Sequence, residues 1–177
     1  MFHFQRIYYF IYEFNALELL KLDKKIVIIY RNYNKPINKI ELKKLVNFCK
    51  IHGRDVFFAG DLKVALKFNF SGLYLPSFNK ILKYSNIKVK KKFRIIGSAH
   101  TIREMRIKEL QNCQEIFISS LFFNPKNKNY LGITKFNLLS LLTNRKVIAL
   151  GGIQKRNIKK LRLTKVSGFA AIRFFKG

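Results

Sequence analysis

Eight apolar segments alternate with segments of helical periodicity along the chain, and this alternation restricts the possible folds more than any other feature. The apolar segments are rich in β-branched and aromatic residues, which is typical of buried strands. They occupy residues 6–12, 26–31, 54–59, 72–76, 94–99, 115–122, 146–151 and 168–175. Helical patterns occupy residues 15–22, 39–53, 61–69, 101–112, 136–144 and 157–163. Strands that alternate with helices in this way form a parallel sheet with helical crossovers.

Eight strand–helix units favour a closed (β/α)8 TIM barrel, an α/β fold, over an open doubly wound sheet. The chain has 177 residues, fewer than the ~200 at the lower end of this fold. It stops at Gly177, just after the eighth strand, so we expect the final outer helix to be missing and a partner subunit of a homo-oligomer to cover that side. No linker or low-complexity segment interrupts residues 1–177, which predicts a single domain.

Local signals mark the ends of several predicted helices. Asp61 stands where an N-cap would start the helix over 61–69. Thr101 and Glu104 have the spacing of a capping box. Gly53 follows the pattern over 39–53 as a natural helix stop.

The chain is strongly basic, with 36 Lys and Arg against 9 Asp and Glu and a formal net charge of +27. Such a charge suggests a polyanionic partner. The lysines are spread through every segment, however, and the basic runs 88–94 and 154–162 suit solvated loop and helix faces equally well. RNA binding is therefore kept as the lesser alternative, and the charge is expected to attract small phosphorylated or carboxylated ligands.

Neither a membrane span nor an export signal is predicted. No apolar run approaches the ~20 residues that a membrane helix needs. The apolar N-terminus carries Arg6 and Glu13 and has neither a basic leader nor a small-residue cleavage site. Cys49 and Cys113 are expected to be free buried thiols in a reducing compartment. These features predict a cytoplasmic protein.

The segment 147-VIALGGI-153 combines a buried-strand pattern with two glycines at the point where the strand ends. Gly151 and Gly152 allow a tight turn with bare N–H groups close to a ligand. Asn157 then opens a short helical pattern, and a helix N-terminus beside free amides suits an anion, above all phosphate. The alternative is a plain turn between strand and helix. Strands seven and eight of such barrels often bind phosphate, which favours the anion site.

Few polar residues stand at the carboxyl ends of the other strands, where these barrels bind their ligands. Arg31 ends the second strand, where a guanidinium would grip a diphosphate or carboxylate, unless it is a plain surface arginine. His100 closes the fifth strand and suits proton transfer, phosphate contact or a structural hydrogen bond. Asp61 follows the third strand as an N-cap or as a Mg²⁺ ligand.

In order and over nearly the whole chain, these motifs resemble the thiamine phosphate synthase and thiazole tautomerase (TenI) family. The most specific matches are 98-SAH-100, 119-SSLF-122, 131-LGITKF-136 and 147-VIALGGIQKRNIKKL-161. The closing 168-GFAAIRFF-175 is similar to the family's last strand, whose backbone helps to hold a thiazole phosphate. The resemblance implies a cytoplasmic barrel of thiamine biosynthesis. It would be either a synthase that uses Mg²⁺ to displace diphosphate from hydroxymethylpyrimidine diphosphate with a thiazole phosphate, or a metal-free tautomerase.

The chain departs from the family at the positions that serve the diphosphate and the metal ion. Of the strand-two motif glutamine-x-arginine-glutamate-lysine, only Arg31 is kept. The asparagine–aspartate pair after strand three aligns with Ala59 and Gly60, which leaves Asp61 one position late. The second metal-binding aspartate aligns with Asn79. A hard dication would lose most of its protein ligands here.

Two further departures concern the tautomerase chemistry and the phosphate pocket. The tautomerase histidine of loop six aligns with Ser120, so this chemistry has no matching side chain. Arg173 stands where the family usually has serine, and there it would either contact the phosphate or block the pocket.

The resemblance leads to a thiamine phosphate synthase-like transferase as the first hypothesis. The phosphate of the thiazole would lie on Gly151, Gly152, Ile172 and Arg173, with Arg31 and His100 as the catalytic side chains across the mouth. A retained synthase would bind Mg²⁺ through Asp61 and substrate oxygens. The alternative is a catalytically degenerate member that binds a phosphorylated ligand or a partner protein.

Overall fold

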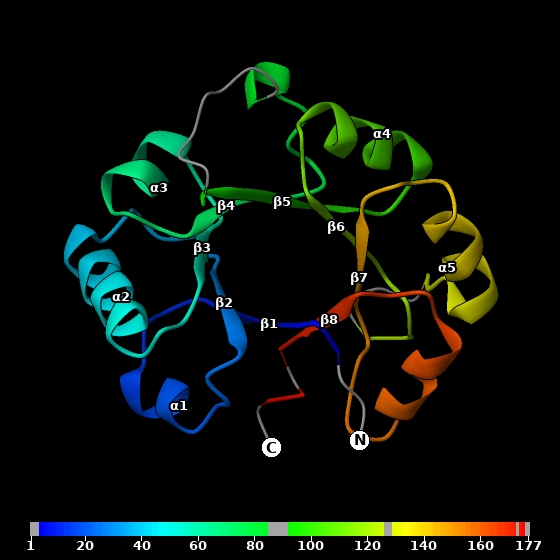
Figure 1. Ribbon diagram of the computed structural model, residues 1–177, viewed down its shortest axis with the longest axis horizontal. Helices are drawn as coiled ribbons and strands as arrows, with labels where there is room; N and C mark the ends of the chain where they lie inside the picture. The colour runs from blue at the N-terminus through cyan, green and yellow to red at the C-terminus, as the bar shows by residue number, and fades with distance from the viewer. Residues whose placement is uncertain (1–3, 85–91, 126–128, 173, 176–177) are drawn as a thin grey trace.

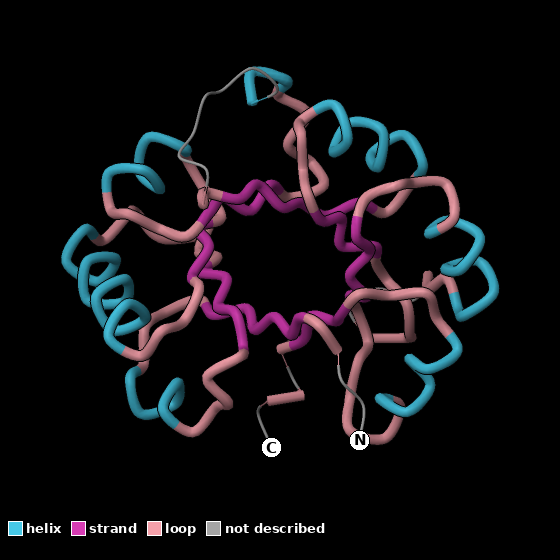
Figure 2. The backbone as a smooth tube through the Cα atoms, in the orientation of Figure 1, coloured by secondary structure: helices cyan, strands magenta, loops and turns pink. Residues whose placement is uncertain are grey.

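Eight parallel strands form a closed barrel in the computed structural model, which describes residues 4–84, 92–125, 129–172 and 174–175. The strands follow one another around the barrel in chain order, and the last pairs with the first (Figures 1 and 2). They are β1 (Arg6–Ile11), β2 (Ile26–Tyr30), β3 (Val56–Phe58), β4 (Gly72–Leu75), β5 (Arg94–Ala99), β6 (Glu115–Ile118), β7 (Lys146–Leu150) and β8 (Gly168–Ala171). The predicted α/β class, the eight strands and the (β/α)8 barrel are confirmed.

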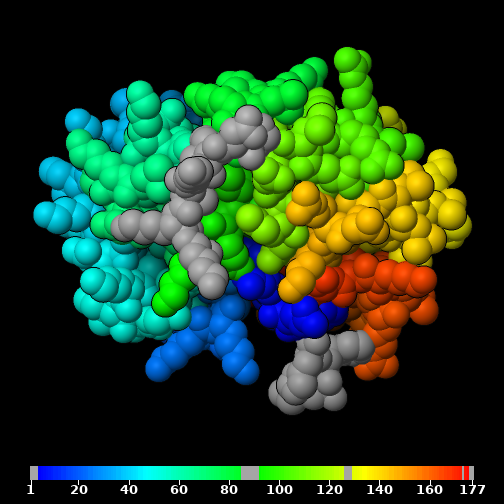
Figure 3. Space-filling model, turned by 45° about the horizontal axis from the view of Figure 1, so that its top comes forward, coloured from blue at the N-terminus to red at the C-terminus, as the bar shows by residue number. Residues whose placement is uncertain are grey.

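Helical segments lie between the strands and surround the barrel (Figure 2). They are α1 (Ala16–Leu20), α2 (Lys39–Ile51), α3 (Leu62–Lys67), the 3₁₀ segment η1 (Leu82–Tyr84), α4 (Ile102–Leu110), α5 (Gly132–Ser140) and the 3₁₀ segment η2 (Ile158–Leu163). In the space-filling view the colour of the outer layer passes from cyan through green and yellow to orange, as neighbouring segments of the chain pack side by side (Figure 3). The outer layer thus covers the apolar backs of the strands.

Two predicted helical segments are helical in the structure but differ from the prediction in bounds or in type. The helix predicted over 136–144 begins at Gly132 and ends at Ser140, because Leu131 before it makes no side-chain cap and so leaves no readable start signal. The segment predicted over 157–163 is a 3₁₀ helix of six residues, not an α-helix. The prediction of a missing final helix falls largely on residues 173, 176 and 177, outside the described part of the chain.

The predicted helix caps are confirmed. Asp61 precedes α3, and its Oδ1 accepts from the amides of Lys63 and Val64. The Thr101 hydroxyl accepts a hydrogen bond from the amide of Glu104. The side-chain carboxylate of Glu104 accepts one from the amide of His100. Cys49 and Cys113 are free and buried, as expected, and burial raises the pKa of each thiol to about 12. No helix in the described residues is long and apolar enough to cross a membrane.

The strands are buried on both faces, and successive residues alternate between two cores. Tyr8 and Phe10 of β1 point into the barrel, whereas Tyr9 and Ile11 pack against the outer helices. The interior is largely aromatic. Phe117 makes edge-on contacts with Tyr8, Phe10 and Tyr74 at ring-centroid distances of 4.8 to 6.4 Å. These rings fill the barrel, so a ligand can bind only at its open end.

A buried ionic cluster closes the amino-terminal end of the barrel. The Glu115 carboxylate is 3% exposed and lies 3.1 Å from Nε of Arg6 and 3.7 Å from Nη1 of Arg94. The Tyr8 hydroxyl donates to the same carboxylate, and Arg94 also pairs with Asp55 at 2.6 Å. Burial and the neighbouring carboxylate raise the pKa of Tyr8, which keeps the phenol protonated as a donor. The cluster ties β1, β5 and β6 together away from any ligand.

Candidate functional site

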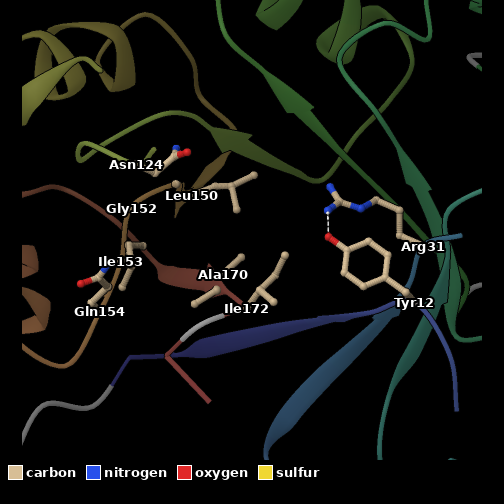
Figure 4. Close-up of a pocket in the computed structure, with 11 residues that line it drawn as sticks. Tyr12, Arg31, Asn124, Leu150, Gly152, Ile153, Gln154, Ala170 and Ile172 are labelled. Carbon is tan, nitrogen blue, oxygen red and sulfur yellow. Dashed lines mark hydrogen bonds between the residues drawn. The ribbon is translucent and has the colours of Figure 1, made fainter. Parts of the chain in front are cut away.

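A pocket of about 380 Å³ opens at the carboxyl ends of the strands. This volume suits a small organic ligand. Figure 4 shows Arg31 and Tyr12 on one side and Gly152, Ile153 and Gln154 on the other. The complete lining is Tyr12, Arg31, Asn124, Leu150, Gly151, Gly152, Ile153, Gln154, Ala170, Ala171 and Ile172. The pocket therefore lies between the carboxyl ends of β7 and β8 on one side and those of β1 and β2 on the other.

The glycine pair is required by its backbone conformation and by a close approach of the chain. Gly151 and Gly152 have φ values of +91° and +70°, in the region that favours glycine. A Cβ on Gly151 would lie 2.2 Å from Oγ of Ser120, and one on Gly152 would lie 2.3 Å from the carbonyl oxygen of Phe122. The loop after β6 thus packs directly against the turn, where the amides of Leu121 and Phe122 donate to Leu150 and Gly151.

Three successive amides of the turn have no hydrogen-bond partner within the part of the chain that the structure describes. Among the described residues, no acceptor takes the N–H groups of Gly151, Gly152 and Ile153, and the same holds for the amide of Ile172. Backbone donors in a protein are nearly always paired, so donors that line a pocket require water or a ligand. The Asn157 side chain fixes the turn, since it donates to the carbonyl of Gly152 and accepts from the amide of Gln154.

The backbone donors at this corner belong to the turn and not to the N-terminus of a long α-helix. The predicted helix opening at Asn157 is the 3₁₀ segment η2, which is too short to carry the aligned dipole of a long α-helix. Free amides that converge from successive residues are a recognised anion-binding arrangement without a helix. Gly151 and Gly152 line the pocket, and the segment after Asn157 is a 3₁₀ helix; the binding of an anion at this turn stays a prediction.

Arg31 lies in the pocket where the sequence placed it, and aromatic side chains hold it. Its Nη2 donates to the hydroxyl of Tyr12 at 2.9 Å. Its guanidinium carbon lies 4.6 Å from the ring centroid of Phe10 and 5.5 Å from that of Tyr12. No carboxylate of the described residues lies within ion-pair distance of Arg31. Tyr12 was not predicted as a pocket residue, although its place at the end of the first apolar segment is a signal that could have found it.

His100 lies apart from the residues that line the pocket. Its Nδ1 is 3.0 Å from the carbonyl oxygen and 3.1 Å from the hydroxyl of Ser119. This contact links the ends of β5 and β6 and corresponds to the structural hydrogen bond that was one of the sequence-based alternatives. A catalytic role for His100 stays a prediction.

The described residues do not fit a Mg²⁺ ion. They contain no group of three or more His, Cys, Asp or Glu side chains that could hold a metal. The exposed Asp61 side chain caps α3, with Ala59 and Gly60 before it. The side chain of Asn79 is bonded to Gln111 and to the amide of Ile81. Mg²⁺ needs an octahedral set of oxygen ligands, usually with one or two carboxylates, and no such set converges here.

The β4 loop that carries Asn79 rests on a buried lysine. Lys108 of α4 donates to the carbonyl of Asn79 at 2.7 Å and to Oε1 of Gln111 at 2.9 Å. Burial lowers the pKa of Lys108 from 10.5 to about 8. Lys108 was also missed, because a lysine within a helical pattern reads as a solvated residue. The remaining predicted phosphate contact, Arg173, lies outside the described residues.

The fold and the pocket define a (β/α)8-barrel protein with a pocket at the carboxyl ends of β7, β8, β1 and β2. A model of the thiamine monophosphate synthase family matches residues 16–175. The chain belongs to this family, as its resemblance predicted.

Individual relatives agree with this assignment. The chain is 29% identical over 165 residues to a thiamine-phosphate synthase of Prochlorococcus marinus, covering 90% of this chain and 47% of the relative. It is 32% identical over 121 residues to a thiamine-phosphate synthase of Methanococcus vannielii, covering 66% of this chain and 58% of the relative. The chain thus spans about half the length of these relatives.

Solved structures support the fold. A thiamine phosphate pyrophosphorylase from Pyrococcus furiosus superposes with a TM-score of 0.77 at 18% identity, over 94% of this chain and 85% of that one. A thiamine phosphate pyrophosphorylase from Bacteroides thetaiotaomicron gives a TM-score of 0.61 at 17% identity, over 96% and 83% of the two chains.

Proposed function

We propose that the protein binds a thiazole monophosphate, with the phosphate against the amides of Gly151, Gly152 and Ile172. The observation that carries this proposal is a set of N–H groups that have no partner among the described residues and belong to residues lining a pocket of about 380 Å³, in a barrel of the thiamine monophosphate synthase family. Charge-assisted hydrogen bonds from backbone amides are short and strong. The net charge of +27 adds a long-range attraction for a phosphorylated ligand.

The apolar part of the lining would receive the ring of the ligand. Leu150, Ile153 and Ile172 lie beside the free amides, and Ala170 leaves room between them. Arg31 faces this corner from the other side of the pocket (Figure 4). Its guanidinium would direct the ring's substituents and receive a second anionic group. These residues bind and orient, and nothing in this arrangement requires a metal ion.

The more specific form of the proposal is that the protein couples the thiazole phosphate to hydroxymethylpyrimidine diphosphate. The alternative is that it binds the thiazole phosphate without this reaction. The family members named above are synthases. In this chain, Ala59, Gly60 and Asn79 stand at the positions of the metal-binding residues and supply no carboxylate. The lack of fit to Mg²⁺ favours the binding-only form.

Calorimetric titration of the purified protein tests the proposal. Thiazole phosphate should bind with measurable heat, and the unphosphorylated thiazole alcohol should bind at least about tenfold more weakly, which corresponds to ~1.4 kcal/mol. Equal affinity for the two would refute a phosphate site. Incubation with both substrates and Mg²⁺ then separates the two forms, since thiamine phosphate accumulates only if the protein couples them.

A further inference from the structure

A second cavity lies at the amino-terminal end of the barrel, opposite the pocket described above. Its volume is about 410 Å³, and it opens between the ends of α2 and α3, which are neighbours around the barrel (Figure 1). The lining residues are Val46, Asn47, Cys49, Lys50, Arg54, Val56, Phe68, Asn69 and Ser71. None of them is acidic, and none also lines the first pocket. The cavity is therefore separate from that pocket.

A buried guanidinium forms part of the cavity wall. Arg54 is 7% exposed, and its side chain donates to the carbonyls of Leu19, Leu22 and Asp23 at 2.6 to 3.0 Å. Its Nε is buried without a hydrogen-bond partner, and no carboxylate of the described residues pairs with it. A buried charge is costly unless it is paired. The three carbonyls offset part of this cost and leave the positive charge without a counter-ion.

The charge of Arg54 reaches the cavity, and no acidic side chain of the lining cancels it. Burial raises the pKa of the Cys49 thiol to about 12, and the positive charge of Arg54 opposes this rise. The thiol is therefore uncharged near pH 7 and does not repel an anion. Asp55, which adds a smaller rise, pairs with Arg94 at 2.6 Å. Lys50 brings a second positive charge to the exposed rim of the cavity.

Polar side chains around the opening have donors to spare. The amides of Asn47 and Asn69 and the ammonium group of Lys50 have no partner among the described residues. The Ser71 hydroxyl accepts from a backbone amide of β3, and its own proton has no acceptor within the described chain. The carbonyls of the last turn of α2, by contrast, accept from the amides of residues 52–54. The cavity thus offers mainly donors and positive charge.

Apolar side chains form the rest of the wall. Val46 comes from α2, Val56 from β3, and Phe68 from the end of α3. Small-molecule sites have volumes of roughly 300–1,000 Å³ and combine apolar walls with a few well-placed polar groups. An anion with an apolar body uses both parts of this wall, whereas a bare inorganic ion uses only the polar part.

We propose that this cavity is a second ligand site, which binds a small organic anion with an apolar body and one carboxylate or phosphate group. The anionic group accepts hydrogen bonds from Asn47, Lys50 and Asn69 and supplies the counter-charge for Arg54. The apolar body packs between α2 and α3. The inference is independent of the proposed function, because the two cavities share no residue.

Nuclear magnetic resonance titration of ¹⁵N-labelled protein in a phosphate-free buffer tests the proposal with benzoate, phenyl phosphate and the neutral benzamide. At least one of the two anions should shift the backbone amide signals of Asn47, Lys50, Asn69 and Ser71 in a saturable manner. Benzamide has nearly the shape of benzoate without its charge, and it should bind at least about tenfold more weakly than that anion. Benzamide binding of equal strength, or no saturable shift of these amides by either anion, would overturn the proposal.

Variants that preserve the backbone test the two asparagines. Alanine at position 47 suits a helix, and glycine at position 69 suits the φ of +59°, so Asn47→Ala and Asn69→Gly should both fold. Each should weaken binding of the anion about tenfold, the fold-change for the loss of one hydrogen bond to a charged group. Variants that bind the anion as tightly as wild type would overturn the assignment. Unfolding curves verify that each variant is folded.

Two matched controls exclude general effects of the substitutions and of the net charge. Asn112→Gly is matched to Asn69→Gly, because Asn112 has φ +56° after α4 and lies outside the cavity. Lys44→Gln is matched to Lys50→Gln, because both residues are exposed lysines of α2 and only Lys50 lines the cavity. The controls should stay within about twofold of wild type, whereas Lys50→Gln should weaken binding severalfold. An equal loss in Lys44→Gln and Lys50→Gln would show a diffuse attraction and overturn the proposal.

The amides of the first pocket distinguish failure of this proposal from failure of the proposed function. Thiazole phosphate should shift the signals of Gly151 and Gly152, and Asn69→Gly should not change its affinity. If benzoate and phenyl phosphate shift only these glycine signals, the second site is refuted and the proposed function stands. If the anions bind between α2 and α3 but thiazole phosphate does not bind at the glycine pair, the second site stands and the proposed function is wrong.

Discussion

Replacement of Gly152 by alanine tests both the strain at the turn and the phosphate site. A residue with a Cβ at φ +70° costs roughly 1–2 kcal/mol. The added Cβ would also lie 2.3 Å from the carbonyl oxygen of Phe122 and 2.6 Å from that of Phe123. These are backbone atoms, so the β6 loop must move by about 1 Å, and overpacking of this kind costs about 1–3 kcal/mol more. We expect a total loss of about 2–5 kcal/mol in the free energy of unfolding.

Gly53→Ala is the matched control. Gly53 has φ +62°, and nothing lies within 4 Å of an added Cβ. It should therefore lose only ~1–2 kcal/mol, and its binding of thiazole phosphate should not change. Urea unfolding followed by circular dichroism measures both stabilities. In calorimetry, Gly152→Ala should bind thiazole phosphate at least about tenfold more weakly, because a turn displaced by about 1 Å loses charge-assisted hydrogen bonds. A folded Gly152→Ala protein with wild-type affinity would show that the phosphate does not lie on this turn.

Three further predictions follow from the contacts of single side chains. Glu115→Ala should lower the free energy of unfolding by about 3 kcal/mol, because two arginines and the Tyr8 hydroxyl lose a buried carboxylate. Glu115→Gln, which keeps an acceptor, should lose less, and equal urea midpoints for the two variants would contradict this. Arg31→Met should weaken thiazole phosphate binding, with Arg31→Lys between it and wild type, as calorimetry would measure. Because the pKa of Lys108 falls from 10.5 to about 8 on burial, the stability of wild type relative to Lys108→Met should rise as the pH increases from 8 to 10.5. A flat difference in urea midpoints across that range would contradict the lowered pKa.

The fold was predictable because its main signals are local and repeated. All eight apolar segments became strands, although the segments predicted to reach residues 122 and 175 end at Ile118 and Ala171. The residues beyond those ends are apolar for a different reason, since Leu121 and Phe122 pack against the barrel from a loop. Apolar character reports burial and does not distinguish a strand from the loop that follows it.

Site residues were predictable only where a glycine or a charged residue stands at the end of a predicted strand. The glycine pair and Arg31 were found because each interrupts an apolar run at a strand end. Tyr12 was not found, because an aromatic residue carries the same sequence signal in a core or in a pocket. Its partner Arg31 follows a different strand, and only the folded barrel brings the two side chains together.

Because β8 pairs with β1, the first strand of the barrel cannot complete its hydrogen bonds until the last strand has been synthesised. Tyr9 lies opposite Ala171, so the first strand keeps an open edge until the last one has been translated. Unpaired strand edges recruit other chains, and contacts between such distant residues form slowly. A ribosome that stalls before β8 would therefore release a polypeptide prone to aggregate, and chaperone capture of nascent chains should persist until that strand emerges.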